Sequence, residues 1–478
     1  MKKLIFIFIS LIISSSYASV QKAGKYYFSK KKIKDRYEKI TFELVKSGYY
    51  FASIEFAKAH LIETKEISDT FEKVLEKLVL RTGTQSFNDV EEKYVKKVKS
   101  PTLSFILAFK FFKSGDYDKA LKYINDVPWK HRFIPEALMM KGSIHNLKNE
   151  YAEANESYSK CVELATQFEG ASKHEKLKRY FAIVKESCII HKGRVSYKQQ
   201  EFKKSLVTYD EIPKVSYRWP YILIEKAWAN YYLEDFNRAL GLLVTYRSPL
   251  LESYFIPESE VLIALSYLKL CLWEDALKVI DRYYNVYKPR SDRLKKILLK
   301  HKNSTNFFYN LVFTPLSKSE KGNEYLRTLV TQIRKKVKFS LDLVAFEQGK
   351  KEIKRLKELK RTKFVRILRK LAIDEAKYRK RQINYFVKKN MFDFINSIHR
   401  YSFEMFNIKL DIISKKRDLV YSNKKLISKR SRGSEKNLNR KETEQLWEFQ
   451  GAFWADELGD YSFGLKSNCE EVKLRGKK

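Results

Sequence analysis

The segment SGDYDKA at residues 114–120 returns 34 residues later as KNEYAEA at 148–154. The same pattern, an aromatic residue three positions before a small one, recurs at 200–205 (QEFKKS), 234–239 (EDFNRA) and 273–276 (WEDA). Each segment ends on a small marker residue, and the markers are Ala120, Ala154, Ser205, Ala239 and Ala276. Successive markers lie 34, 51, 34 and 37 residues apart, so one step contains a 17-residue insertion. Regular spacing of this length predicts stacked supersecondary units.

Two further positions recur when the marker of each unit is numbered position 20. A small residue occupies position 8, and these residues are Ala108, Gly142, Gly193, Ala227 and Ala264. Four of the five units have proline at position 1: Pro101, Pro135, Pro220 and Pro257. Proline in the first turn of a helix presets φ and loses no hydrogen bond. The pattern therefore predicts two antiparallel helices per unit, with position 8 at their closest approach.

This pattern resembles the tetratricopeptide repeat, a 34-residue helix–turn–helix unit. The resemblance covers residues 101–168 and 186–290, but tryptophan is absent from position 4 and proline stands at position 1. It implies an all-α fold in which residues 101–290 form a repeat array, a tetratricopeptide-like α-solenoid. Residues 34–67 resemble a further, degenerate unit within a stretch of degenerate helical repeats at 19–100.

Arrays of this family bind a peptide or a helix on the concave face built by the first helix of each unit. The side chains expected to line that face are Phe105, Phe109, Phe112, Arg194, Tyr197, Tyr221, Ile224, Trp228 and Tyr231. Large aromatic side chains bury much area for little loss of rotamer entropy, which suits a peptide-binding groove. The alternative is that these aromatic residues only pack against neighbouring helices.

The amino terminus has the pattern of a targeting signal. Two lysines precede a largely apolar run at residues 4–13, and small residues, Ser16 and Ala18, precede a cleavage point. This order is typical of a secretory signal peptide at residues 1–18. No later run approaches the ~18 apolar residues of a membrane-spanning helix. We therefore expect an exported protein, periplasmic rather than secreted.

The positive charge is concentrated in one part of the chain. Residues 291–440 hold +27 of the formal net charge of +39, and no proline follows Pro315. Apolar residues at Leu326, Val330, Ile333, Val337, Leu341 and Val344 predict one helical stripe. Residues 291–427 are thus expected to form a basic helical hairpin or coiled coil, followed by a linker at 428–443. The basic faces could simply be solvated. They could instead contact anionic envelope polymer or lipid, bind an acidic partner or the acidic tail of this chain, or bind nucleic acid.

The tail at 444–478 differs from the rest of the chain. It contains LWEFQGAFWADELGDY at 446–461, which is rich in aromatic and acidic residues. We expect Trp447, Phe449, Phe453 and Trp454 to dock, either as a cap on the array or on a partner. The segment is similar to carboxy-terminal segments of exported tetratricopeptide proteins of gliding and predatory bacteria, some associated with adventurous gliding motility. That similarity implies a role in motility.

No catalytic motif is found. The seven histidines form no zinc-protease motif, and the fifteen glycines provide no phosphate-binding loop or nucleophile elbow. The four cysteines have no zinc-ligand spacing, and Cys161 and Cys271 are expected to be buried free thiols. The sequence therefore predicts neither an enzyme nor a metal or cofactor site, and no small-molecule substrate.

These observations together favour an exported scaffold or adaptor that binds protein partners in an envelope assembly. The main alternative is an envelope-surface binder whose basic helices contact anionic polymer or lipid. Export argues against nucleic acid as the partner.

Overall fold

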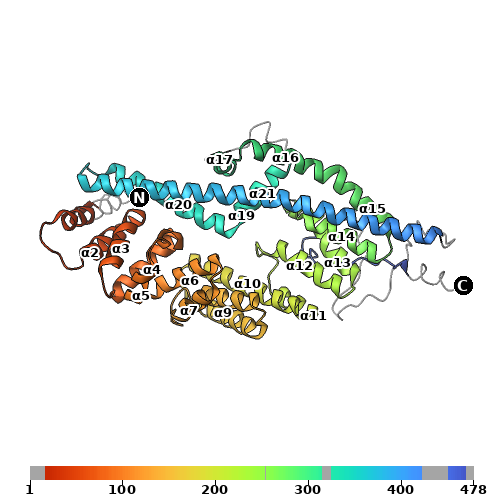
Figure 1. The fold of residues 1–478 in the computed structure, drawn as a ribbon, viewed down its shortest axis with the longest axis horizontal. Helices are drawn as coiled ribbons and strands as arrows, with labels where there is room; N and C mark the ends of the chain where they lie inside the picture. Colours follow the sequence, from red (N-terminus) through yellow and green to blue (C-terminus); the bar gives the residue numbers. More distant parts are fainter. Residues whose placement is uncertain (1–16, 253, 315–323, 422–450, 470–478) are drawn as a thin grey trace, which may run out of the picture. The chain divides into compact units, whose positions relative to one another are not determined.

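The computed structural model describes residues 17–252, 254–314, 324–421 and 451–469 (Figure 1). Within these ranges the protein forms nineteen α-helices and no β-strand, so the all-α prediction is confirmed. The helices of the repeat region are α2 (Arg36–Lys46), α3 (Tyr50–Glu63), α4 (Asp69–Thr82), α5 (Glu92–Val98), α6 (Pro101–Ser114), α7 (Tyr117–Asn125), α8 (Ile134–Leu147), α9 (Tyr151–Ala171), α10 (Glu175–Lys198), α11 (Phe202–Asp210), α12 (Trp219–Tyr232), α13 (Phe236–Val244), α14 (Pro257–Lys269) and α15 (Trp273–Arg282). The basic segment forms α16 (Lys288–Lys300), α17 (Phe307–Phe313), α19 (Glu324–Lys335), α20 (Val337–Glu358) and α21 (Lys363–Tyr421).

The turn between the two helices of a unit has the same geometry in all five units. Position 15 has a positive φ each time, at Gly115, Asn149, Gln200, Glu234 and Cys271. In the first unit the N–H of Gly115 donates to Phe112 O and that of Asp116 to Phe111 O, the two bonds of a Schellman motif. The same two bonds recur in the other four units and at Gly48, between α2 and α3. The five units and the α2–α3 pair are therefore helical hairpins with one turn geometry.

The two helices of a unit meet where position 8 packs against position 24. A Cβ on Gly142 would lie 2.7 Å from Tyr158, and one on Gly193 would lie 2.5 Å from Tyr209. In the three units with alanine at position 8, position 24 is instead a buried aliphatic residue: Ile124, Leu243 or Ile280. The larger side chain at position 24 thus accompanies glycine, the smaller residue, at position 8. The helical, solenoid-like fold depends on these matched pairs.

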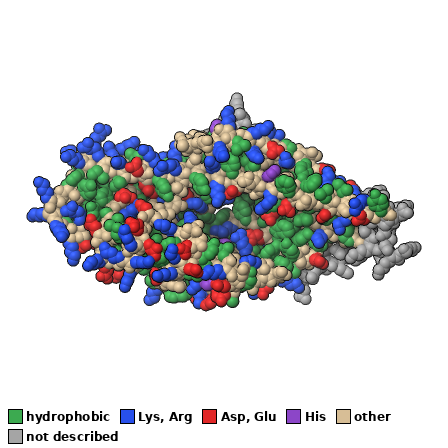
Figure 2. All heavy atoms as spheres, viewed as in Figure 1, with side chains coloured by type: hydrophobic (Ala, Val, Ile, Leu, Met, Phe, Trp, Pro, Cys, Tyr) green, Lys and Arg blue, Asp and Glu red, His purple; other side chains and the backbone are tan. Residues whose placement is uncertain are grey.

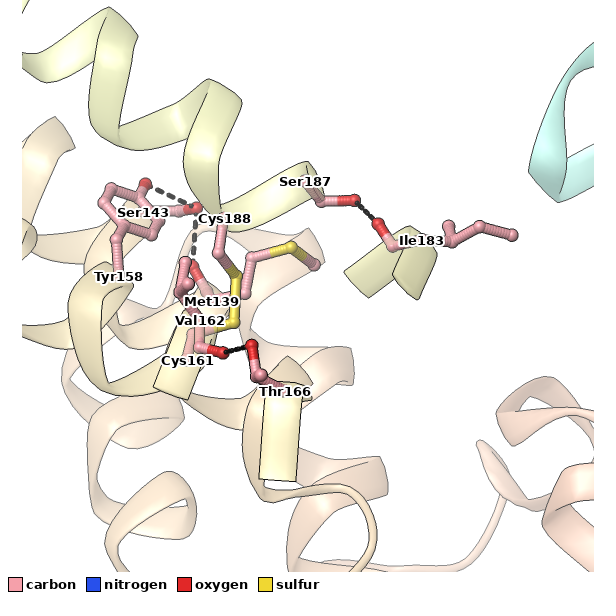
Figure 3. Close-up of a disulfide and its surroundings, with 9 residues drawn as sticks. All are labelled: Met139, Ser143, Tyr158, Cys161, Val162, Thr166, Ile183, Ser187 and Cys188. Carbon is pink, nitrogen blue, oxygen red and sulfur yellow. Dashed lines mark hydrogen bonds between the residues drawn. A yellow bond between two sulfur atoms is a disulfide. The ribbon is translucent and has the colours of Figure 1, made fainter. Parts of the chain in front are cut away.

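The 17-residue insertion is absorbed by two longer helices. α9 and α10 have 21 and 24 residues, whereas α7 and α8 have 9 and 14. A disulfide between Cys161 and Cys188 joins α9 to α10, with 6.3 Å between the Cα atoms (Figure 3). A second disulfide joins Cys271 to Cys469. The prediction of free thiols at Cys161 and Cys271 was therefore wrong. Cys161 and Cys188 are buried on adjacent helices, where a disulfide fits as well as a free thiol. Cys271 is instead only partly buried, in the turn between α14 and α15, where it meets Cys469 of the tail. The sequence does not show which cysteines face each other.

The contacts divide the chain into two compact units, each discontinuous in sequence. The first unit comprises residues 1–188 and 337–384, and the second comprises 189–336 and 385–478. Each unit thus combines helical repeats with part of the basic segment. The described residues 17–28 are helical, and Val20 and Ala23 are buried. Most of the predicted signal peptide, residues 1–16, lies outside the described residues.

In the first unit, α20 and the start of α21 pack on the repeats through buried charges. Glu352 is only 1% exposed and accepts the backbone N–H groups of Phe51 and Ala52 at 3.0 and 2.8 Å, which caps the amino terminus of α3. Arg379, also 1% exposed, donates to Glu375 and to Ser86 at 3.1 and 2.5 Å. Some charges of the basic segment therefore lie in the core.

In the second unit, the rest of α21 packs on α15 and the residues that follow it. Tyr283 donates its hydroxyl to Ile398 O at 2.8 Å, and Tyr284 donates to Ser402 O at 2.5 Å. The buried side chains of α21, a helix of 59 residues, recur in steps of three and four residues from Leu368 to Ile412. One face of the helix is therefore covered between these two residues.

The apolar stripe predicted from Leu326 to Val344 does not continue as one buried face. The helix is interrupted between α19 and α20 at Lys336, and beyond that point Leu341 and Val344 are 58% and 52% exposed. After the interruption the buried residues are instead Phe339, Asp342, Ala345, Phe346, Gly349, Glu352 and Leu356. Among the described residues, no helix is both long and apolar enough to cross a membrane.

The first prediction tests the pairing of positions 8 and 24. Gly142→Ala should lower the free energy of unfolding by about 1–3 kcal/mol, because the new methyl group overlaps the Tyr158 ring. Adding Tyr158→Ile recreates the alanine–isoleucine pair found in the first and fifth units and should restore part of this loss. Urea denaturation of the three proteins measures the coupling. Gly170→Ala is the control, since its Cβ would have no neighbour within 4 Å. Additive losses in the double variant would contradict the pairing.

The second prediction concerns pH. Burial raises the pKa of Glu352 to about 7, against 4.5 for a free glutamate. Because the folded-state pKa is the higher one, the stability that Glu352 contributes is fully present below pH 4.5 and is lost as the pH rises to 7. The unfolding free energy of the wild type should therefore fall relative to Glu352→Gln by about 3 kcal/mol over this range. Urea titrations of both proteins at pH 4.5 and 7.5 measure the difference. An unchanged difference would show that Glu352 does not titrate there.

Candidate functional site

A groove lies on the second unit over α10, α12 and α14, the first helices of the last three repeats. It has a volume of about 340 Å³. Its lining residues are Arg194, Tyr197, Tyr209, Glu225, Trp228, Tyr232 and Glu258. We refer to this set as the α10–α14 groove.

Helical spacing places these side chains on shared faces. Arg194 and Tyr197 lie three residues apart on α10, while Glu225, Trp228 and Tyr232 follow in steps of three and four on α12. Glu258 lies in the first turn of α14. Tyr209 reaches the groove from α11 because its ring passes against Gly193, where no side chain blocks it.

One wall of the groove is an ion pair. The guanidinium of Arg194 donates from Nε to Glu225 Oε2 at 2.9 Å and from Nη2 to Oε1 at 2.5 Å. This bidentate arrangement is the strong, oriented form of an arginine–carboxylate contact. Tyr209 adds a third bond by donating its hydroxyl to Glu225 at 2.8 Å. Burial, together with the nearby Glu225 charge, raises the pKa of Tyr209 above its usual value, so the phenol stays protonated as a donor.

The other wall is aromatic. The rings of Trp228 and Tyr232 lie 6.0 Å apart, and those of Tyr197 and Tyr232 lie 5.9 Å apart. Tyr232 is supported by stacking on Phe202 at 5.1 Å, yet it remains 52% exposed. The indole N–H of Trp228 donates to Glu258 at 2.8 Å. Accessible aromatic surface thus lies directly beside a carboxylate.

Three of the residues predicted for a groove, Arg194, Tyr197 and Trp228, come together here. Tyr231 instead packs against Phe236, and Tyr221 packs against Tyr254. Ile224 is only 8% exposed. Sequence reasoning missed Tyr209, Glu225, Tyr232 and Glu258. Two of these residues could have been predicted from the sequence, because Glu225 and Tyr232 lie one helical turn before and after Trp228.

The predicted residues of α6 lie in the first unit and are not part of this groove. Phe105 is 6% exposed and stacks on Phe133 at 4.6 Å. The ring of Phe109 lies 4.1 Å from Lys113 Nζ, and that of Phe112 lies 6.2 Å from Tyr117. The stacking of Phe105 matches the alternative expectation of packing between helices.

The carboxy-terminal tail docks within its own unit. Gly459 lies against Trp219 and Leu223 and donates its N–H to Thr245 Oγ1 at 3.2 Å. The side-chain amide of Asn237 makes two hydrogen bonds to the backbone of Leu465: it accepts from Leu465 N at 2.9 Å and donates to Leu465 O at 3.1 Å. The Cys271–Cys469 disulfide fixes the far end.

The aromatic residues predicted to dock the tail contribute little to this contact. Trp447 and Phe449 lie outside the described residues. Phe453 packs on Tyr461 at 5.9 Å, and Trp454 is 64% exposed. Backbone groups, a disulfide and the Lys214–Asp460 ion pair at 2.6 Å hold the described tail. None of these tail residues lines the α10–α14 groove.

No metal centre is found in the part of the chain that the structure describes, where no group of three or more His, Cys, Asp or Glu could hold an ion. The groove instead offers aromatic faces, an ion pair and a further carboxylate. This chemistry is suited to non-covalent binding.

Comparison with known proteins gives no family. No protein-family model matches the chain, and a search of curated proteins finds no match. Functional inference therefore rests on the repeat pattern and on the geometry of the groove.

The third prediction tests the docking of the tail. A Cβ on Gly241 would lie 1.8 Å from Tyr461 O, so Gly241→Ala should displace the tail. The amides of Gly459, Phe463 and Leu465, which donate to Thr245 or Asn237 in the wild type, should then exchange hydrogen about tenfold faster. Hydrogen exchange measured by mass spectrometry on the intact protein tests this. Gly170→Ala should leave these amides unchanged, and full protection in Gly241→Ala would disprove the contact.

Proposed function

We propose that this protein is an exported scaffold of the tetratricopeptide type that binds peptide segments of partner proteins in an envelope assembly. The observation that supports it most is the α10–α14 groove, with Trp228 and Tyr232 presented on the first-helix face. Recurrent hairpins with one turn geometry support the repeat type, since their first helices present side chains side by side. The proposed work is binding, with no covalent step.

Export is part of the proposal. The basic, apolar and small-residue order of the amino terminus supports it. The two disulfides also support it, because such bonds persist mainly in oxidising compartments such as the bacterial periplasm. A role in gliding motility is the most specific form of the proposal, and it rests on the tail sequence alone.

A second candidate function, contact with an anionic envelope polymer or lipid, is favoured by one surface. Exposed cations gather where α20 meets α21 in the first unit (Figure 2). They include Lys354, Lys357, Lys360, Arg361, Lys363 and Arg366. Attraction by such a patch fades with ionic strength, whereas aromatic contacts in a groove hold. Binding measured at 50 and 500 mM salt separates the two functions.

The fourth prediction tests the groove. Peptide ligands selected from a displayed library against the full chain should bind the Trp228→Ala, Tyr232→Ala double variant at least tenfold more weakly. The reason is that the variant removes the accessible aromatic wall. Fluorescence anisotropy gives the affinities, and circular dichroism checks that helicity is unchanged.

Trp454→Ala is the matched control for this experiment. It removes a 64% exposed tryptophan that does not line the groove, so affinity should stay at the wild-type value. Equal binding by the double variant and the wild type would reject the groove as the peptide site.

A further inference from the structure

We propose that the α10–α14 groove selects a positively charged side chain, lysine or arginine, in the bound peptide. This inference rests on the proposed function and names the chemistry of its ligand. The observations behind it are the aromatic rings of Tyr197, Trp228 and Tyr232 and the carboxylate of Glu258, which help to line a groove of about 340 Å³.

The aromatic wall is built to hold a cation. Tyr197, Trp228 and Tyr232 form a contiguous group, with ring centroids about 6 Å apart. The face of an aromatic ring has a negative quadrupole and attracts a cation within about 6 Å, with tryptophan the strongest of the three residue types. Because Tyr232 is half exposed, its ring is accessible to a ligand from solvent.

Glu258 supplies the charge. Its described partners are the indole N–H of Trp228 and the hydroxyl of Tyr401, both neutral groups. Among the described residues no ion pair joins Glu258 directly to a lysine or arginine. One cation lies close by, because Arg400 donates to the same Tyr401 hydroxyl at 2.9 Å and so faces Glu258 through that neutral group. A carboxylate held beside an aromatic group is the complement of an ammonium or guanidinium ligand.

The wall formed by Arg194 and Glu225 already contains a guanidinium group beside a carboxylate. Arg194 already places a guanidinium on Glu225 through a bidentate contact and stays partly exposed, at 48% of its side-chain surface. With this pair neutral, the remaining charge of the groove lining is the −1 of Glu258. The lining of the groove therefore carries one net negative charge, within a chain of net charge +39. Charges beyond about 8 Å are largely screened at physiological salt, so the charges that bear on a ligand are Glu258 in the lining and Arg400 behind Tyr401.

The test uses two capped tripeptides, acetyl-Gly-Arg-Gly-amide and its citrulline counterpart, which differ in charge but hardly in shape. Each is titrated into the full-length protein with ¹⁵N-labelled tryptophan while the indole signal of Trp228, assigned with Trp228→Phe, is followed by NMR. The arginine peptide should shift this signal and bind at least fivefold more tightly than the citrulline peptide. Glu258→Gln should reduce that preference below twofold. Glu252→Gln, a change at an exposed glutamate outside the groove, should preserve it.

Equal affinities for the arginine and citrulline peptides would overturn the charge selection. So would tighter binding of tetramethylammonium than of the arginine peptide, which would assign the groove to a quaternary ammonium ligand. In both cases library peptides that still require Trp228 and Tyr232 would leave the proposed function intact. If no library peptide depends on these two residues, the proposed function fails and this inference falls with it.

Discussion

The close approach of two helices within each repeat is the constraint on which the fold depends. Where position 8 is glycine, a tyrosine fills the space, as Tyr158 does at Gly142; where position 8 is alanine, an aliphatic residue suffices. Cores have the packing density of organic crystals, so the volumes of the two facing residues must be matched. The same pairing places Tyr209 beneath Gly193, and from there its hydroxyl reaches Glu225. The groove is therefore a direct consequence of how the hairpin packs.

The basic segment has a structural role that its net charge conceals. Glu352 caps α3 from about 300 residues away, and Arg379 is buried among Glu375, Ser86 and Asp342. A buried charge is tolerated only when it is paired or hydrogen-bonded, so these contacts specify where α20 and α21 pack. The exposed lysines and arginines around them remain available for other contacts. The net charge of the segment therefore counts together the buried charged groups that hold its helices in place and the exposed groups that face solvent.

How far the sequence predicted the structure depends on the range of each interaction. Periodic markers such as Ala120 and Ala154 predicted the helical hairpins, because the contacts within a hairpin are local. Arg194, Tyr197 and Trp228 were placed in a groove for the same reason. The partner of Cys271 and the capping of α3 by Glu352 are contacts between distant parts of the chain, which no local pattern specifies. The partner of Cys161 lies on the next helix, but no repeated pattern of the sequence marks Cys188 as facing it. Tyr232 was missed in favour of Tyr231 because one residue in a helix turns the side chain by about 100°.

The second unit presents two different kinds of recognition. The tail is held mainly through its backbone, by Asn237 and Thr245, and is made permanent by the Cys271–Cys469 disulfide. Backbone hydrogen bonds do not depend on which side chains the tail carries. The disulfide does depend on the sequence of the tail, because it requires a cysteine at position 469. The α10–α14 groove instead presents the side chains of Trp228, Tyr232 and Glu258, and we propose that these distinguish a ligand by its side chain. Since none of residues 451–469 lines the groove, the partner binding that we propose there does not require this part of the tail to move.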